Sequence, residues 1–275
     1  MRRRQLLALA AALGAASCAQ PPVRRAPSAG PTVGVLPTPF TIPGLNRQRT
    51  VRLYLPPSYA SAPERRYPVI YMHDGQNLFD DATSYAGEWG VDETMDAFAR
   101  VRGFEAIVVG IDNGAEKRMT ELNPCDHPEF GVGEGEAYVS FIVGVLKPYI
   151  DTHYRTLPGR ASTCVFGSSM GGLISDYAIR RHPGVFGKAG VFSPAYWTAP
   201  SFWDYAAAHP LPADARVYLY MGGQEGAQMV SLAQRMEGVL KSQGTPHVFH
   251  LVPNGEHNEP TWRGMFPLAV HWLFG

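Results

Sequence analysis

From residue 50 onward, short runs of consecutive apolar residues alternate with segments whose apolar residues recur every three or four positions. Several of the runs, such as Val-Ile-Tyr-Met and Ala-Ile-Val-Val-Gly-Ile, contain no polar side chain. Such runs are typical of strands that are buried on both faces, as in a parallel sheet. They predict strands at 51–55, 68–72, 106–111, 162–166, 188–192, 216–221 and 247–252.

The segments with the longer period predict helices between these strands. The clearest is 137–154, where Tyr138, Phe141, Ile142 and Val145 fall on one helical face. Further helices are expected at 91–100, 170–181, 201–208, 228–243 and 259–273. This alternation predicts an α/β fold, with a mostly parallel central sheet and helices on both faces. In such folds the loops that follow the strands gather at one edge and carry the functional site.

The amino terminus predicts export. An apolar run at 6–16 follows three arginines directly, and it is too short to span a bilayer, which takes about 20 residues. The sequence Ala15-Ala16-Ser17-Cys18 then resembles a bacterial lipoprotein box. We therefore expect 1–17 to be a signal peptide and Cys18 to be lipidated, with plain cleavage at the small residues as the alternative. The expected location is the bacterial cell envelope, either lipid-anchored or periplasmic.

The segment that follows is rich in proline and shows neither a helical nor a strand period. Residues 18–45 are therefore expected to form an extended tether that leads into the edge of the fold, and 46–275 a single catalytic domain of the α/β-hydrolase type. The length of 275 residues would allow two domains, but sheet-and-helix folds often reach about 250 residues as one unit.

Composition narrows the possible functions. Basic and acidic residues number 24 each, and loss of the signal peptide would leave a net acidic chain, which argues against nucleic acid as a partner. Contact with a membrane is expected only through a lipid on Cys18. Cys125 and Cys164 are expected to be free thiols, and their spacing predicts no zinc site. Neither a metal nor an organic cofactor is expected.

The strongest chemical signal is Gly167-Ser168-Ser169-Met170-Gly171-Gly172, which lies between an expected strand and an expected helix. Gly-x-Ser-x-Gly in that setting is the nucleophile elbow, a turn so tight that glycines are needed on either side of the serine. Ser169 is therefore the candidate nucleophile, at a helix N-terminus whose partial positive charge favours an oxyanion. The alternative is a glycine-rich helix cap with an inert serine.

A serine nucleophile needs a base and an acid, which in this fold class follow it in the order acid, then histidine. His257 lies in a turn-rich loop after the last strand, whereas the other late histidines fall within regular elements. Glu225 is the only carboxylate in the loop after the strand at 216–221, and it would orient the imidazole. Glu256 is a weaker candidate for the acid. An exposed loop carboxylate is the other interpretation of Glu225.

Two backbone N–H groups are needed to stabilise an oxyanion. One is expected from Met170, directly after the nucleophile. The other is expected from Gln76, in the loop after the strand at 68–72, where Gly75 would let the backbone turn toward the substrate. Asp74 in the same loop is interpreted as structural, and a cation held by it and nearby aspartates is the alternative.

Four motifs in this order resemble one family. They are Tyr-Met-His-Asp-Gly-Gln-Asn-Leu-Phe-Asp (71–80), Gly-Ser-Ser-Met-Gly-Gly (167–172), Gly-Gly-Gln-Glu-Gly (222–226) and Gly-Glu-His-Asn-Glu (255–259) with Trp262. The chain resembles the esterase branch of the α/β-hydrolase superfamily, which includes feruloyl and acetyl-xylan esterases, S-formylglutathione hydrolase, enterochelin esterases and the mycolyltransferase antigens. The resemblance implies hydrolysis of carboxylic esters by Ser169, His257 and an acid carried onto Glu225. Many members carry Asp as the acid, and some rely on a Ser–His dyad.

Loops near the expected site suggest how a substrate would bind. No long insertion follows the strand at 188–192, where related hydrolases often carry a lid, so an open cleft is expected. Trp89 and Trp197 lie in loops near the site and would stack on an aryl or sugar group, and packing of those loops is the alternative. Arg118 would pair with an acidic substrate, or else be a solvated charge.

We therefore expect a serine esterase that forms an acyl-enzyme on Ser169 with His257 as general base. Its expected substrates are small acyl or aryl esters in the cell envelope, either small molecules or groups linked to polysaccharide. An acyltransferase on the same scaffold is one alternative. A non-catalytic binding protein is the other.

Overall fold

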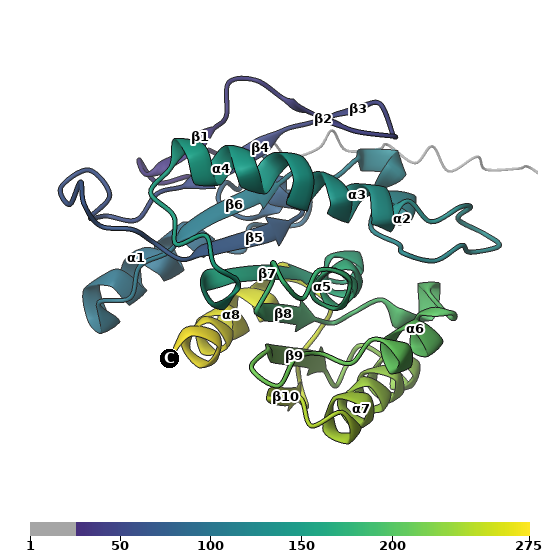
Figure 1. Ribbon diagram of the computed structural model, residues 1–275. Coiled ribbons are helices and arrows are strands. Elements are labelled where there is room, and N and C mark those ends of the chain that lie inside the picture. The colour runs from purple at the N-terminus through teal and green to yellow at the C-terminus, as the bar shows by residue number, and fades with distance from the viewer. Residues whose placement is uncertain (1–25) are drawn as a thin grey trace, which may run out of the picture.

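The computed structural model describes residues 26–275 of the chain and is built around an eight-stranded β-sheet (Figure 1). The expected signal peptide at 1–17 and the expected lipid on Cys18 lie outside the described residues. Within residues 26–275, no helix is long and apolar enough to cross a membrane.

Six adjacent strands of the large sheet pair in parallel, and two strands at one edge pair antiparallel. In order across the sheet they are β1 (Val33–Val35), β4 (Val51–Tyr54), β6 (Ile107–Ile111), β5 (Val69–His73), β7 (Thr163–Ser168), β8 (Lys188–Phe192), β9 (Arg216–Gly222) and β10 (His247–Val252). Strands β5, β6 and β7 are buried along their whole length, which explains their continuous apolar runs. All seven strands predicted from the sequence are confirmed, with ends within two residues of the predicted ones.

The folded domain begins before residue 45, so the predicted boundary of the tether is too late, although this segment does form an edge of the fold as expected. Strand β1 forms one edge of the large sheet. Strands β2 (Phe40–Ile42) and β3 (Arg47–Arg49) form an antiparallel hairpin. Further upstream, the Ser28 hydroxyl donates to Glu88 Oε2 at 2.9 Å. These strands have three residues each, which is too short to show an apolar period among the prolines.

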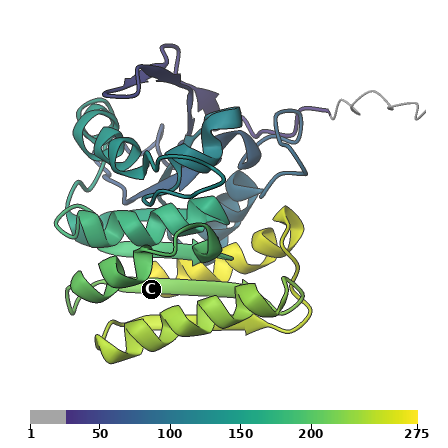
Figure 2. The same ribbon diagram turned by 90° about the vertical axis from the view of Figure 1, so that its right-hand side faces the viewer.

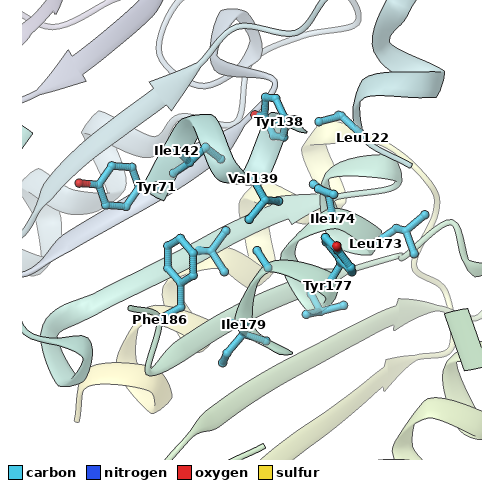
Figure 3. Close-up of a cluster of buried hydrophobic side chains, with 14 of the residues drawn as sticks. Tyr71, Leu122, Tyr138, Val139, Ile142, Leu173, Ile174, Tyr177, Ile179 and Phe186 are labelled. Carbon is cyan, nitrogen blue, oxygen red and sulfur yellow. The ribbon is translucent and has the colours of Figure 1, made fainter. Parts of the chain in front are cut away.

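Helices cover both faces of the sheet, as the two views show (Figures 1 and 2). They are α1 (Val91–Arg102), α2 (Arg118–Glu121), α3 (Gly135–Phe141), α4 (Lys147–His153), α5 (Met170–Arg181), α6 (Phe202–Ala208), α7 (Ala227–Ser242) and α8 (Glu259–Phe274). Buried residues of α1 and α8 share one apolar cluster, and those of α3, α5 and α7 share the other. Figure 3 shows part of the second cluster, to which Tyr71 of β5, Val139 of α3 and Ile174 of α5 contribute side chains. The predicted α/β fold is therefore confirmed.

The helix predicted at 137–154 is present, but its middle is wider than an α-helix. Residues Ile142–Leu146 form a π-helical segment between α3 and α4. The backbone stays helical at both junctions, with φ and ψ of −59° and −46° at Ile142. Pro148 explains the change, because it has no N–H to donate to the carbonyl four residues earlier and its ring would clash with that carbonyl.

Cys125 and Cys164 are both free, as the sequence predicted. Cys164 is buried in strand β7, and burial raises the pKa of its thiol to about 12. A thiol that stays protonated is a poor nucleophile and a poor metal ligand. Cys164 therefore acts as a small core residue.

Candidate active site

Ser169 forms a one-residue turn between strand β7 and helix α5. Its φ and ψ angles are 58° and −120°, which are costly for a residue that carries a side chain. The turn is held on both sides: the Ser169 N–H donates to the carbonyl of Phe192 at 2.9 Å, and its carbonyl accepts from the N–H of Ala195 at 3.0 Å. The half-buried serine is thereby placed at the edge of the sheet where the parallel strands end.

Glycines allow this turn because there is no room for a side chain around it. A methyl group at Gly167 would lie 2.8 Å from the carbonyl carbon of Gly171, and one at Gly172 would lie 2.5 Å from the carbonyl oxygen of Phe192. A methyl group at Gly171 would lie 3.1 Å from Cβ of His73. The start of α5 therefore packs directly against its neighbours at the strand ends, as the Gly-x-Ser-x-Gly pattern predicted.

His257 lies in the loop between β10 and α8, and its Nδ1 is 2.7 Å from Oε2 of Glu225. Because an ionised carboxylate only accepts hydrogen bonds, Nδ1 carries the proton in this pair and Nε2 remains available as a base. The Glu225 side chain is 1% exposed, whereas that of His257 is 39% exposed. A fixed carboxylate thus orients a ring that faces solvent. Glu256, the weaker candidate for the acid, instead accepts from Asn258 Nδ2.

Other groups hold the Glu225 carboxylate. Its Oε1 accepts from the Ser193 hydroxyl at 2.6 Å and from the Gly222 N–H at 2.9 Å. The same hydroxyl accepts from Trp262 Nε1 at 2.9 Å, and the Trp262 ring meets the His257 ring edge-on, with centroids 4.9 Å apart. Ser193 is not among the residues predicted from the sequence. Its position directly after strand β8, at the edge that carries the other loops, is the signal that indicates it.

Residues 192–195 join the Glu225–His257 pair to the turn at Ser169. Phe192 and Ala195 hydrogen-bond to the Ser169 backbone, and Ser193 between them hydrogen-bonds to Glu225. The N–H of Ser193 also donates to the carbonyl of Tyr220 in β9 at 2.8 Å. The loops that follow β7, β8 and β9 are therefore tied together around the candidate nucleophile.

The two N–H groups predicted to stabilise an oxyanion follow neighbouring strands of the sheet. Met170 is the first residue of α5, so its N–H is one of those that lack a partner within the helix. Gln76 lies in a short 3-10 turn, Gly75–Asn77, directly after β5. A methyl group at Gly75 would lie 2.6 Å from the backbone of Gly110, so the turn requires glycine there.

Arg118 is paired within the chain. Its Nε and Nη2 donate to the two carboxylate oxygens of Asp74 at 2.6 and 2.8 Å, and Asn113 Nδ2 donates to Oδ1 of Asp74 at 2.7 Å. Arg118 is thus neither isolated nor simply solvated, because its charge pairs with a carboxylate 44 residues away in the sequence. Contact with an acidic substrate stays a prediction. Among residues 26–275, no group of three or more His, Cys, Asp or Glu side chains is placed to hold a metal ion.

Trp89 cannot stack on a substrate in this structure, which corrects its assignment as a binding residue. It is 3% exposed and packs in the core beneath α8, with ring centroids 5.8 Å from Phe192 and 5.7 Å from Trp262. Trp197, by contrast, is 42% exposed. Both tryptophans lie in loops near the strand ends, and only the folded structure distinguishes a ring turned inward from one turned outward.

A mostly parallel sheet with a serine on a strained strand-to-helix turn is the architecture of α/β-hydrolases. The chain belongs to the esterase family described as "Putative esterase", whose model matches residues 42–273. It is a carboxylic ester hydrolase, as the sequence predicted.

Individual relatives agree with this family. The chain is 29% identical over 244 residues to the uncharacterized protein YbbA of Bacillus subtilis (strain 168), covering 82% of this chain and 93% of YbbA. It is 26% identical over 196 residues to the ferri-bacillibactin esterase BesA of the same organism, covering 58% of this chain and 62% of BesA. A solved ferulic acid esterase matches with a TM-score of 0.68 and 19% identity, over 88% of this chain and 98% of that protein. At such low identity, the structural match shows a shared fold.

Replacing Ser193 by alanine is expected to lower the free energy of unfolding by about 1–3 kcal/mol, because the Trp262 N–H and Glu225 Oε1 would lose their shared partner. Urea denaturation of the wild type, Ser193→Ala, Trp262→Phe and the double variant measures this effect. The loss of unfolding free energy in the double variant should be smaller than the sum of the losses in the two single variants, since each single variant already removes the hydrogen bond between Ser193 and Trp262. Strict additivity would contradict the network.

Proposed function

We propose that this esterase acts through an acyl-enzyme on Ser169, with His257 as general base and Glu225 as the acid that orients it. The supporting observation is the turn at Ser169, because a serine is held at φ 58° only where surrounding structure stabilises it, and such backbone strain clusters at functional sites. The hydrogen bond between Glu225 and His257 supports the assignment of the other two roles.

In the first half of the reaction, Ser169 Oγ attacks the ester carbonyl carbon and gives its proton to His257 Nε2. The N–H groups of Met170 and Gln76 donate to the oxyanion that forms. The bond to the alcohol oxygen then breaks, and the imidazolium returns the proton to the departing alcohol. In the second half, water gives a proton to His257 and attacks the acyl carbon. The bond from that carbon to Ser169 Oγ then breaks, the imidazolium returns the proton to Oγ, and the carboxylic acid leaves.

Ser169→Ala should abolish hydrolysis of p-nitrophenyl acetate, with a fall in kcat of about 10⁴-fold or more, since loss of a nucleophile removes the acyl-enzyme route. Ser168→Ala is the matched control, because it alters the neighbouring serine of the same motif. Initial rates across short acyl chains measure both. Equal activity of Ser169→Ala and the wild type would show that the turn does not carry the nucleophile.

We also propose that the substrate is a small acyl or aryl ester, free or linked to polysaccharide. The ring of an aryl substrate lies against an aromatic cluster, which is formed by His127, Phe130 and Trp197. The rings of His127 and Phe130 stack with centroids 4.5 Å apart, and Trp197 meets Phe130 edge-on at 5.9 Å. Ferulic acid, named in one structural relative, carries an aromatic ring. A partly exposed set of rings offers such a group a flat apolar contact.

A chain of contacts leads from the aromatic cluster to Met170, the residue after the candidate nucleophile. Asn123 Nδ2 donates to the carbonyl of Thr198 at 2.9 Å, which ties the loop that carries His127 and Phe130 to the residue after Trp197. The Thr198 hydroxyl in turn lies 3.6 Å from Sδ of Met170, the residue after Ser169. A ring bound at the cluster would therefore lie close to the reacting ester.

Trp197→Ala should lower kcat/KM for methyl ferulate up to about tenfold while leaving p-nitrophenyl acetate nearly unchanged, because ring contacts contribute about 0.5–1.5 kcal/mol. Leu268→Ala, which removes a 48% exposed side chain on α8, is the control. An equal fall for both esters would point to damage of the site and would contradict an aromatic subsite.

We further propose that the enzyme works at the bacterial cell envelope, held there by a lipid on Cys18. The support is the sequence of residues 1–18, which lie outside the described part of the chain. In cells that express the full chain, Cys18→Ala should move the protein from the membrane fraction to the soluble one. The same distribution for the wild type and the variant would contradict the lipid anchor.

A further inference from the structure

The turn that carries the Gln76 N–H is adjacent to a partly buried ion pair between Asp74 and Arg118. Asp74, the residue that precedes this turn, is 7% exposed and has φ and ψ of 56° and 46°, a left-handed conformation that is uncommon for a residue with a side chain. Three donors bind its carboxylate: Nε and Nη2 of Arg118 and Nδ2 of Asn113. The unusual backbone of Asp74 is therefore fixed through its side chain.

Asn113 connects this carboxylate to Gln76. While its side-chain amide donates to Asp74, its backbone N–H donates to Oε1 of Gln76 at 3.1 Å. The N–H of Asn77 in turn donates to the carbonyl of Asp74 at 2.9 Å. Gln76 is thus connected to Asp74 through Asn113, and Asn77 is connected to Asp74 directly.

The same carboxylate lies beside the turn at Ser169. A methyl group at Gly171 would be 3.4 Å from Oδ2 of Asp74, which is ordinary van der Waals distance. The Asp74 side chain therefore lies against the start of α5, while its backbone leads into the turn at Gln76. A shift of this side chain would change the spacing between the Gln76 and Met170 N–H groups.

The charge of Arg118 keeps this arrangement stable. Burial alone would raise the pKa of Asp74, but the Arg118 guanidinium and the Asn113 amide lower it overall, so the carboxylate stays ionised. Burial likewise opposes the charge of Arg118, while Asp74 and the nearby Glu259 raise its pKa. Because a guanidinium binds a carboxylate through two parallel hydrogen bonds, it fixes the orientation of the carboxylate as well as its charge.

We propose that Arg118 is a positioning residue for ester hydrolysis: through Asp74 it fixes the Gln76 N–H at the distance from the Met170 N–H that the oxyanion requires. This inference rests on the proposed acyl-enzyme mechanism. It differs from a role in binding an acidic substrate, because the guanidinium acts through Asp74 and needs no contact with the substrate. Loss of the Arg118 guanidinium should therefore weaken stabilisation of the transition state more than binding of the ester.

The test compares Arg118→Met, Arg118→Lys and Asn113→Ala with the wild type on p-nitrophenyl acetate, a neutral ester. Removal of one oxyanion donor costs about 10²- to 10³-fold in kcat, so its displacement in Arg118→Met should cost about 10- to 100-fold, with KM nearly unchanged. Arg118→Lys keeps the charge without the paired hydrogen bonds and should recover part of the loss. Asn113→Ala should show a smaller fall in kcat of the same kind.

Arg181→Met is the matched control, because Arg181 also forms a paired contact with a carboxylate, that of Glu136. It lies at the opposite end of α5 from Ser169. It should leave kcat unchanged. Thermal unfolding of each variant separates loss of folded protein from loss of rate.

A second readout, the rate at which a fluorophosphonate labels Ser169, keeps the two proposals apart. If the wild type is labelled and Arg118→Met is labelled at the same rate with the same kcat, the positioning role is wrong while the nucleophile stands. A rise in KM at constant kcat would also overturn it, in favour of substrate binding. If the wild type is neither labelled nor active, the proposed mechanism itself fails, and the inference with it.

Discussion

The positive φ angle of Ser169 is the constraint on which the rest of the site depends. A non-glycine residue in a sparsely populated conformation costs of the order of 1–3 kcal/mol, and it persists only where the surroundings fix it. Here β7 is buried along its whole length, α5 follows without a linker, and glycines at 167, 171 and 172 leave no side chain between helix and sheet. The packed sheet thus stabilises a turn that a free peptide would not keep.

Of the two side chains paired near this turn, Glu225 is buried and held in place, whereas His257 is accessible to solvent. A buried carboxylate must be fully hydrogen-bonded, and Glu225 meets that condition with donors on both oxygens. His257, which it orients, is open to solvent and can meet both a substrate and water. The proposed acid is therefore fixed by the strands and their loops, while the proposed base keeps the access that proton transfer needs.

The sequence predicts well what depends on local pattern. Continuous apolar runs indicate buried parallel strands, and the order serine, acid, histidine places three loops at one edge. It predicts poorly what depends on residues that are distant in the sequence. The carboxylate that pairs with Arg118 is 44 residues away. The burial of Trp89 depends on aromatic rings of β8 and α8. The error at 28–45 has the same cause, because a three-residue strand such as β1 is defined by its neighbour β4 and not by its own period.

The residues proposed to perform the chemistry differ in their support from those proposed to select the substrate. Ser169, Glu225 and the turn at Gln76 are each tied to the ends of buried strands, so a change there disturbs the sheet itself. In the aromatic cluster, His127 and Phe130 lie on a loop closed by hydrogen bonds between His127 and Gly131, whereas Trp197 lies in the segment after β8. Thr198 links this segment to Asn123 and to Met170. Loops of this kind tolerate change because few core contacts depend on them. A scaffold built this way can exchange one ester for another while the proposed oxyanion donors and nucleophile stay in place, which fits relatives named for ester substrates as different as ferri-bacillibactin and ferulic acid.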